Sequence, residues 1–299
     1  MSDTTIGIDL GGTRIKAVSI DRSGRILHRH YHPTNDTEEG EWKNAVAESV
    51  RELRNKTGGN ITIGLSAPGL PDPGNTAIAF MPGRLQGLEN FDWTVFLGYP
   101  TLVLNDAIAA MMAEARFGAA KNRKNVVMLT LGTGVGGAIL IDGKPYQGAF
   151  NKAGHIGHMV IDSDGEPDIV GMPGSLEDAI GNCSIKKRTS GKFQSTRLLL
   201  EACRNNDKFA NDIWLTSVRK LAAGLASLTN ILSPEMIVLG GGIAEAGDNL
   251  FSPLQEYMAL YEWRTGGNRV EIVKALHGDM AGAMGAACFA RETAGQLKY

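Results

Sequence analysis

Cysteine is scarce in this sequence. The 299 residues include three cysteines, Cys183, Cys203 and Cys288, an odd number at wide spacings. This pattern excludes a disulfide framework and a metal site of the Cys-x-x-Cys type. Reduced thiols are the simpler interpretation, and they predict a cytoplasmic protein.

Charge of one sign and long hydrophobic runs are also missing. Thirty Lys and Arg residues against 32 Asp and Glu residues give a formal net charge of −2, and the basic runs at 121–124 and 186–187 are short. We therefore expect no nucleic-acid partner. The most apolar run, 126–141, is too short and too rich in Gly and Thr to span a membrane, so no membrane association is expected either. The first nine residues lack the basic start and the apolar segment of a secretory signal.

Glycine, in contrast, is abundant. Many of its 38 residues fall in tight clusters, which indicate backbone that approaches a ligand closely. The apolar fraction of 43% and the charged fraction of 21% are ordinary for a soluble globular protein. The length suits two domains or one large α/β domain.

The spacing of apolar residues predicts a mixed α/β fold. Alternating residues at 5–10, 15–21 and 25–32 predict a three-stranded meander, and a second meander begins at 125–132 and 136–143. The other expected elements are helices at 38–56, 106–118, about 209–232 and about 281–294, and strands at 61–69, 101–107 and 235–242.

The two meanders indicate a duplication. The segment DLGGTRIK at 9–16 weakly resembles LGTGVGGA at 131–138, and each follows the first strand of its half. We therefore expect two related α/β domains with a cleft between them. No low-complexity linker separates them, so a shared hinge is expected near 107–122.

Three glycine clusters follow apolar strands, at 9–13, 132–137 and 240–242. Such turns point backbone N–H groups into a concavity that accepts phosphate oxygens. Any one of them alone is equally compatible with an ordinary tight hairpin. Residues 132–137 match Gly-x-Gly-x-x-Gly, but a dinucleotide site requires a helix to follow and a strand is expected here. No Walker A lysine motif occurs, so a phosphate site in a turn that joins two strands is the remaining interpretation.

Several motifs resemble those of the ROK family of bacterial sugar kinases and repressors, which belongs to the actin-like ATPase superfamily. The matching segments, in the order typical of that family, are IGIDLGGTRIK at 6–16, LNDA at 104–107, LTLGTGVGGAIL at 129–140, AGHIGH at 153–158 and IVLGGGI at 237–243. The first phosphate turn lies within the first 13 residues, which leaves no room for the helix-turn-helix of a repressor. A kinase is therefore expected.

The resemblance implies an actin-like, ribonuclease H-like fold of duplicated βββαβα domains with an interdomain cleft. The expected small N-terminal domain spans 1–116 plus a C-terminal helix at about 287–299, and it would carry the first phosphate turn and the catalytic Asp. The expected large domain spans 117–286 and would carry the second phosphate turn, the sugar loop and the adenosine site.

The resemblance also assigns roles to residues. Asp106 resembles the base that takes the proton of a sugar hydroxyl, although Asp also commonly caps helices and that role is the alternative. Asp9 resembles the residue that holds the Mg²⁺ of ATP, directly or through water. The expected ATP and phosphate contacts are Asp9, Gly11, Gly12, Thr13, Lys16, Gly132, Thr133, Gly134, Gly241 and Gly242. For Lys16, a solvated surface charge is the alternative.

The expected sugar contacts are Asn105, Asp106, His155, His158, Glu177, Asn90 and Gly69. The match at Asn90 is loose, and a turn role is the alternative there. His155 stands where the family usually has a sugar-binding Glu, so hydroxyl recognition should differ. If this segment were a strand, His155 could instead face away from the sugar.

Members of the family hold a structural zinc with a His and three Cys residues near the sugar loop. Here the cysteine positions carry Asp168, Val170 and Ser175, which leaves too few ligands for a structural zinc. We therefore expect no zinc, and we expect packing by Val170 and Met172 to support the loop instead.

The expected function is ATP-dependent and Mg²⁺-dependent phosphorylation of a hexose or N-acetylhexosamine at the 6-hydroxyl, as in a glucokinase. The alternative is a sugar-sensing protein with a kinase fold and little turnover. The sequence does not identify the sugar, and polyphosphate remains possible as the donor. A homodimer is expected from the resemblance alone.

Overall fold

The computed structural model describes residues 4–36, 40–57, 61–81, 83 and 85–296. The chain divides into two compact units: unit 1 comprises 1–122, 143–153 and 276–299, and unit 2 comprises 123–142 and 154–275. Unit 1 thus takes in the segments 117–122, 143–153 and 276–286 in addition to the parts expected from the sequence. Within the expected elements, residues 38–39 and 297–299 lie outside the described residues.

Unit 1 is built on a five-stranded sheet in the order β3-β2-β1-β4-β7. These strands are β1 (Thr5–Leu10), β2 (Arg14–Ile20), β3 (Ile26–Pro33), β4 (Thr62–Ala67) and β7 (Thr101–Asn105). The first three form the expected antiparallel meander, and β4 and β7 run parallel to β1. Every residue of β1 is buried, because this central strand is covered on both faces.

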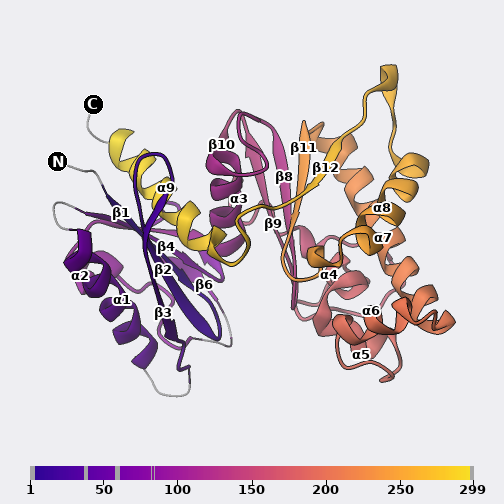
Figure 1. Cartoon of the computed structure of the whole chain (residues 1–299), viewed down its shortest axis with the longest axis horizontal. Helices are drawn as coiled ribbons and strands as arrows, with labels where there is room; N and C mark the ends of the chain where they lie inside the picture. Colours follow the sequence, from indigo (N-terminus) through magenta and orange to yellow (C-terminus); the bar gives the residue numbers. More distant parts are fainter. Residues whose placement is uncertain (1–3, 37–39, 58–60, 82, 84, 297–299) are drawn as a thin grey trace. The chain divides into compact units, whose positions relative to one another are not determined.

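Helix α1 (Glu41–Thr57) covers one face of the first sheet (Figure 1). Its buried residues Trp42, Val46, Val50 and Leu53 recur every three or four positions, which places them on one side of a helix. Glu41 begins the helix and Arg54 and Lys56 lie in its last turn, so the charges complement the helix dipole as the sequence predicted.

Helix α9 (Ala281–Gln296) packs against β1 and β4 so closely that neither Gly7 nor Gly64 could carry a side chain. A Cβ atom added to Gly7 would lie 1.8 Å from the carbonyl oxygen of Ala283, and one added to Gly64 would lie 1.9 Å from that of Ala286. Glycines in the strands therefore let the helix backbone rest directly on the sheet. This close contact brings the first turn of α9 to the end of β1.

Unit 2 contains four strands in the order β9-β8-β11-β12, which repeats the order β2-β1-β4-β7 of unit 1. These strands are β8 (Val126–Leu131), β9 (Val135–Ile141), β11 (Met236–Gly240) and β12 (Glu271–Lys274), and the short strand β10 (Lys144–Pro145) belongs to the segment 143–153. Strand β9 is antiparallel to β8, while β11 and β12 run parallel to it, as their counterparts do in unit 1. The predicted duplication is therefore confirmed.

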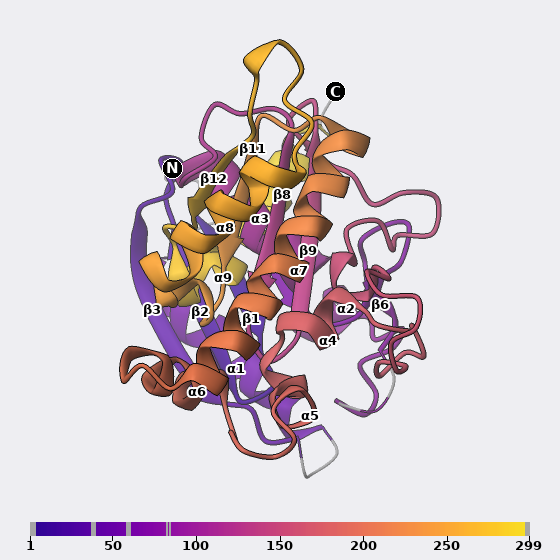
Figure 2. The same cartoon turned by 90° about the vertical axis from the view of Figure 1, so that its right-hand side faces the viewer.

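Figure 2 looks onto α7 (Lys208–Leu232) and α8 (Asp248–Tyr261), which cover one face of the second sheet. Among the described residues, the other elements are α2 (Trp93–Leu97), α3 (Asp106–Phe117), α4 (Leu176–Ile180), α5 (Ile185–Arg188), α6 (Thr196–Arg204), the short strands β5 (Leu70–Pro71) and β6 (Ile78–Phe80), and five 3-10 turns. Within the described residues, no helix combines the length and the hydrophobicity needed to cross a membrane.

Candidate active site

The first glycine turn, residues 11–13, joins β1 to β2. Thr34, just after β3, fastens this turn twice: its hydroxyl donates to the carbonyl oxygen of Gly11 at 2.7 Å, and its N–H donates to the carbonyl oxygen of Thr13 at 3.0 Å. The sequence did not single out Thr34, because only the pairing of β3 with β2 brings it beside the turn.

Asp9 lies near the end of β1, immediately before this turn. Its carboxylate accepts hydrogen bonds from Lys16 Nζ and from the Ser66 hydroxyl, both at 3.0 Å. The start of α9 also lies against this carboxylate, since a Cβ atom added to Gly282 would lie 2.8 Å from Asp9 Cγ. Lys16 is therefore an ion-pair partner of Asp9 with a side chain that is 20% exposed, which is not the environment of a solvated surface lysine.

Asn105 and Asp106 lie where β7 passes directly into α3. Asn105 is the N-cap of the helix: its Oδ1 accepts from the N–H of Ala107 at 3.0 Å, and its Nδ2 donates to the carbonyl oxygen of Gly69 at 3.0 Å. The alternative in which Asp106 caps the helix is therefore wrong. Asp106 is the first helical residue, where the helix dipole favours a negative charge.

Asp106 has the most perturbed carboxyl of this region. The residue is exposed, but the surrounding protein desolvates its carboxyl, and the negative charge of Asp9 acts in the same direction. Together these effects outweigh the hydrogen bond from the N–H of Ala107 and raise its pKa to about 6. A carboxyl with this pKa is ionised at neutral pH yet remains a useful proton acceptor.

Two other predicted sugar residues belong to the same unit. Gly69 has a φ of +104°, and a Cβ atom there would lie 2.6 Å from the carbonyl oxygen of Phe80, so the position requires glycine. Asn90 is exposed in a left-handed turn with a φ of +55°, and its N–H donates to the carbonyl oxygen of Ile78. Asn90 therefore shapes a turn, and its predicted sugar contact stays a prediction.

The second glycine turn, residues 132–134, joins β8 to β9 in unit 2. The N–H groups of Asn182 and Cys183 donate to the carbonyl oxygens of Gly132 and Thr133, at 3.0 and 2.7 Å. These contacts come from the segment after α4, which sequence inspection did not connect with the turn. The motif contains no signal for them, because they use only backbone atoms.

Glu177 lies against this second turn. Its Oε2 accepts from the N–H of Val135 at 2.8 Å, and a Cβ atom added to Gly134 would lie 2.2 Å from the same oxygen. The structure thus brings a predicted sugar residue into contact with a predicted phosphate turn.

The third glycine turn lies in the same unit. Gly241 in this turn has a φ of +84°, and a side chain there would clash with the backbone of Leu131.

His155 precedes a 3-10 turn, Ile156–His158, and His158 ends it, so neither lies on a strand. The argument that strand alternation turns His155 away therefore does not apply. Gly157 allows this turn to rest on β9, since a Cβ atom there would lie 2.0 Å from the carbonyl oxygen of Val135. Both histidines are partly exposed, and His158 Nδ1 lies 2.9 Å from Asp168 Oδ2.

The sugar loop, which we define as residues 162–175, is supported differently from our expectation. Val170 is 54% exposed and Met172 is 38% exposed, so their side chains do not form the predicted packing. Asp168 organises the loop instead, because its Oδ1 accepts from the N–H groups of both residues at 2.9 Å.

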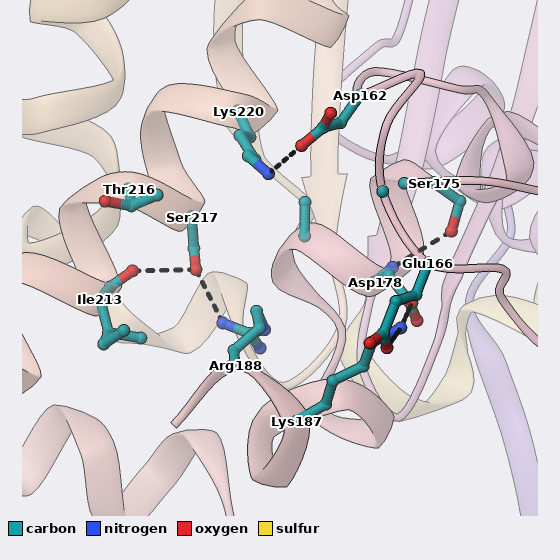
Figure 3. A pocket seen from close by; sticks show the side chains of 13 residues that line it. Asp162, Glu166, Ser175, Asp178, Lys187, Arg188, Ile213, Thr216, Ser217 and Lys220 are labelled. Atoms are coloured by element: carbon teal, nitrogen blue, oxygen red, sulfur yellow. Dashed lines mark hydrogen bonds and ion pairs between the residues drawn. The ribbon is translucent and has the colours of Figure 1, made fainter. Parts of the chain in front are cut away.

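Residues of this loop line a pocket together with residues of α4, α5 and α7 (Figure 3). Lys220 of α7 pairs with Asp162 at 3.1 Å, and Lys187 of α5 pairs with Asp178 at 2.7 Å and with Glu166 at 3.0 Å. These ion pairs fasten the loop and α4 to the neighbouring helices.

Arg188 lines the same pocket. Its guanidinium donates to the Ser217 hydroxyl (Figure 3). It also donates to the carbonyl oxygens of Ile180 and Gly181 and to the Ser184 hydroxyl. Burial lowers its pKa to about 10. Arg188 therefore fixes the segment that follows α4, whose N–H groups hold the second glycine turn.

Among the described residues, no cluster of three or more His, Cys, Asp or Glu side chains could hold a metal ion. The positions of the zinc-binding cysteines have other roles here: Asp168 binds backbone N–H groups, Val170 faces solvent and Ser175 caps α4. These residues do not fit a structural zinc. Asp9 fits Mg²⁺ only together with nucleotide oxygens and water, which is how Mg²⁺ is usually bound.

Comparisons with known proteins identify the family. A sequence model of the ROK family matches residues 5–293. A glucokinase of Streptomyces coelicolor is 32% identical over 96% of this chain and 98% of its own. The ROK hexokinase of Thermus thermophilus is 29% identical, with a TM-score of 0.88 over 98% of this chain and 99% of its own. A ROK family glucokinase of Streptomyces griseus, solved with glucose and AMPPNP, is 29% identical, with a TM-score of 0.80 over 97% and 99%.

These matches cover nearly the whole chain and agree with the duplicated topology of its two sheets. The fold is therefore the actin-like fold of the ROK kinases, and the resemblance seen in the motifs is confirmed. The chain belongs to the ROK family.

Proposed function

We propose that this protein is a sugar kinase that transfers the γ-phosphoryl group of ATP to a hydroxyl of a hexose or N-acetylhexosamine. One observation carries the proposal: Asp106 begins α3 with a pKa raised to about 6, in the same unit as the Asp9 carboxylate and the first glycine turn. The similarity to a glucokinase and to a ROK structure that holds glucose and AMPPNP supports both substrates.

In the proposed reaction, the Asp106 carboxylate takes the proton of the sugar hydroxyl as that oxygen attacks the γ-phosphorus. The bond between the γ-phosphorus and the bridging oxygen breaks, and ADP leaves. General base catalysis of this kind contributes about 100- to 10,000-fold to a rate. We propose the 6-hydroxyl as the acceptor, because a primary hydroxyl is the least hindered nucleophile of a hexose.

The glycine turns are the proposed phosphate contacts. Residues 11–13 and 132–134 each lie in a hairpin whose carbonyl groups are held by other parts of the same unit. Lys16 adds a positive charge beside Asp9. Mg²⁺, held by Asp9 with phosphate oxygens and water, would neutralise negative charge on the transferred group.

The proposed sugar contacts are Asn105, Asp106, His155, His158 and Glu177. Carboxylate and imidazole groups can accept hydrogen bonds from hydroxyls, while the second N–H of the Asn105 amide can donate one.

We also propose that the protein is a homodimer. Light scattering after size-exclusion chromatography would test this, with a mass of two chains as the expected result.

A coupled assay of ADP release tests the function directly. Glucose, mannose, N-acetylglucosamine, N-acetylmannosamine, fructose and allose should be compared with ATP and with polyphosphate as donors. We expect turnover with at least one sugar and ATP, and loss of turnover when EDTA removes the divalent ion. If no sugar is phosphorylated but one of them raises the melting temperature, a sugar sensor replaces the kinase.

A further inference from the structure

The Asp168 carboxylate is the centre of a dense hydrogen-bond network. Its side chain is fully buried, with 0% exposure, although it belongs to an otherwise open loop. Oδ1 accepts from the N–H groups of Val170 and Met172, and Oδ2 lies 2.9 Å from His158 Nδ1. The Ser175 side chain, at the start of α4, also lowers the pKa of this carboxyl.

These partners determine the charge of Asp168. Burial raises the pKa of the Asp168 carboxyl, but hydrogen bonds from His158, Met172, Ser175 and Val170 outweigh burial and hold it below the ordinary value. Asp168 is therefore ionised at neutral pH. An ionised carboxylate only accepts hydrogen bonds, so the hydrogen of the bond to His158 must be carried by Nδ1.

We propose that Asp168 is a positioning residue that fixes the tautomer of His158, so that Nδ1 carries the hydrogen and Nε2 is left as an acceptor for a sugar hydroxyl. In a neutral imidazole one nitrogen donates and the other accepts, so fixing Nδ1 also fixes Nε2. The part of this proposal that concerns the sugar depends on the proposed kinase function.

The surroundings of His158 support this role. The side chain is 29% exposed while Asp168 is fully buried, so the imidazole lies between the network and solvent. The 3-10 turn that carries His158 rests on β9 through Gly157, which limits movement of its backbone. Asp168 thus constrains a ring whose backbone is already fixed.

The variant Asp168→Asn should change the tautomer of His158 while it keeps the shape of the loop. The amide oxygen of Asn can still accept from the N–H groups of Val170 and Met172. The amide nitrogen then faces His158 Nδ1 and donates to it, so the hydrogen of the imidazole must move to Nε2. The loop is kept, but the outer nitrogen of His158 changes from acceptor to donor.

The first measurement is the tautomer itself. Imidazole ¹⁵N–¹H correlation spectra of protein labelled at its six histidines distinguish the two tautomers, and His158→Gln identifies the signals of His158. We expect the Nδ1–H form in the wild type and the Nε2–H form in Asp168→Asn. An Nε2–H form in the wild type, or an unchanged tautomer in the variant, overturns the proposal.

The second measurement is kinetic. Asp168→Asn should raise the KM for the sugar with the highest turnover by about tenfold, the size of one hydrogen bond, while kcat and the KM for ATP change little. Its melting temperature should stay near that of the wild type, whereas Asp168→Ala should lower it because the loop loses its acceptor. If the tautomer changes but the KM for sugar does not, the proposed contact through Nε2 is overturned.

Asp164→Asn is the matched control. Asp164 lies in the same loop and is exposed, and among the described residues its carboxylate accepts no hydrogen bond, so the same loss of charge should change neither the spectrum nor the KM. The imidazole spectra can be recorded whether or not the protein has kinase activity. If the wild type phosphorylates no sugar, the kinase proposal fails while the tautomer measurement still decides the role of Asp168.

Discussion

The two glycine turns occupy the same place in two sheets of the same topology, yet different contacts hold them. Thr34 fastens the first turn from the neighbouring strand, and the turn is flanked by the charged pair of Asp9 and Lys16. The second turn is fastened by backbone N–H groups from the segment after α4, and Glu177 lies against it. Duplication therefore repeats the hairpin but not the residues around it.

The carboxylates beside the two turns therefore differ in their roles, one set being available for catalysis and the other stabilising the hairpin. In unit 1 the carboxylates of Asp9 and Asp106 carry charge that a reaction can use, and Asp106 has a raised pKa. In unit 2 the carboxylate beside the turn holds a backbone N–H group of the hairpin itself. Changes in unit 1 should therefore reduce catalysis without unfolding the protein, and changes at the second turn should reduce stability.

The largest effect is expected from Asp106→Asn. An amide cannot take the proton of a hydroxyl, so kcat should fall by about 100- to 10,000-fold while sugar binding, measured by calorimetry, persists. Asp212→Asn, an exposed carboxylate on α7, is the control and should keep wild-type kcat. Wild-type turnover in Asp106→Asn would exclude Asp106 as the base.

Gly134→Ala tests the support of the second turn. Its Cβ atom would lie 2.2 Å from Glu177 Oε2, so urea unfolding should show a loss of about 1 to 3 kcal/mol. Gly132→Ala is a matched substitution in the same turn, where a Cβ atom meets nothing within 4 Å, and its stability should stay within about 0.5 kcal/mol of the wild type. Equal losses in the two variants would show that Glu177 does not brace the turn.

The pH dependence of catalysis tests the charge in unit 1. Because the pKa of Asp106 is raised to about 6, the base is protonated below that pH and ionised above it. The value of kcat/KM should therefore rise with pH, reach half its plateau near pH 6, and fall about tenfold per pH unit below that point. A plateau that extends unchanged down to pH 5 would contradict this assignment.

Lys16→Met should have the smallest effect. The variant removes the ammonium that lies 3.0 Å from Asp9 Oδ2, so the KM for ATP should rise by about 3- to 10-fold with little change in the KM for sugar. Lys56→Met, at the exposed end of α1, is the control. An unchanged KM for ATP would place Lys16 outside the phosphate site.

Much of the site could be predicted from residue patterns. The glycine turns and the junction of Asn105 with Asp106 follow from apolar strands that end in small or acidic residues. The supports were not predictable. Thr34, Ser66, Asn182 and Arg188 act through contacts between residues that are distant in sequence, and some of these contacts use backbone atoms that every residue has.

One alternative and one expectation failed for physical reasons. A helix cap was the alternative role of Asp106, but Asn105 is the cap, because β7 ends at Asn105, two residues before the end of the expected strand at 101–107. Val170 and Met172 were expected to pack, but their side chains face solvent while their N–H groups bind Asp168. A hydropathy pattern does not show which backbone groups need an acceptor.

The sequence by itself determined the duplicated α/β fold, the glycine turns and the family, because these depend on local spacing and on motifs. Only the tertiary structure decided that Glu177 contacts the second turn and that Asp168 binds His158. Residues 42 and 10 positions apart meet there because the chain folds back on itself, and hydrogen bonds depend on that geometry and not on sequence distance.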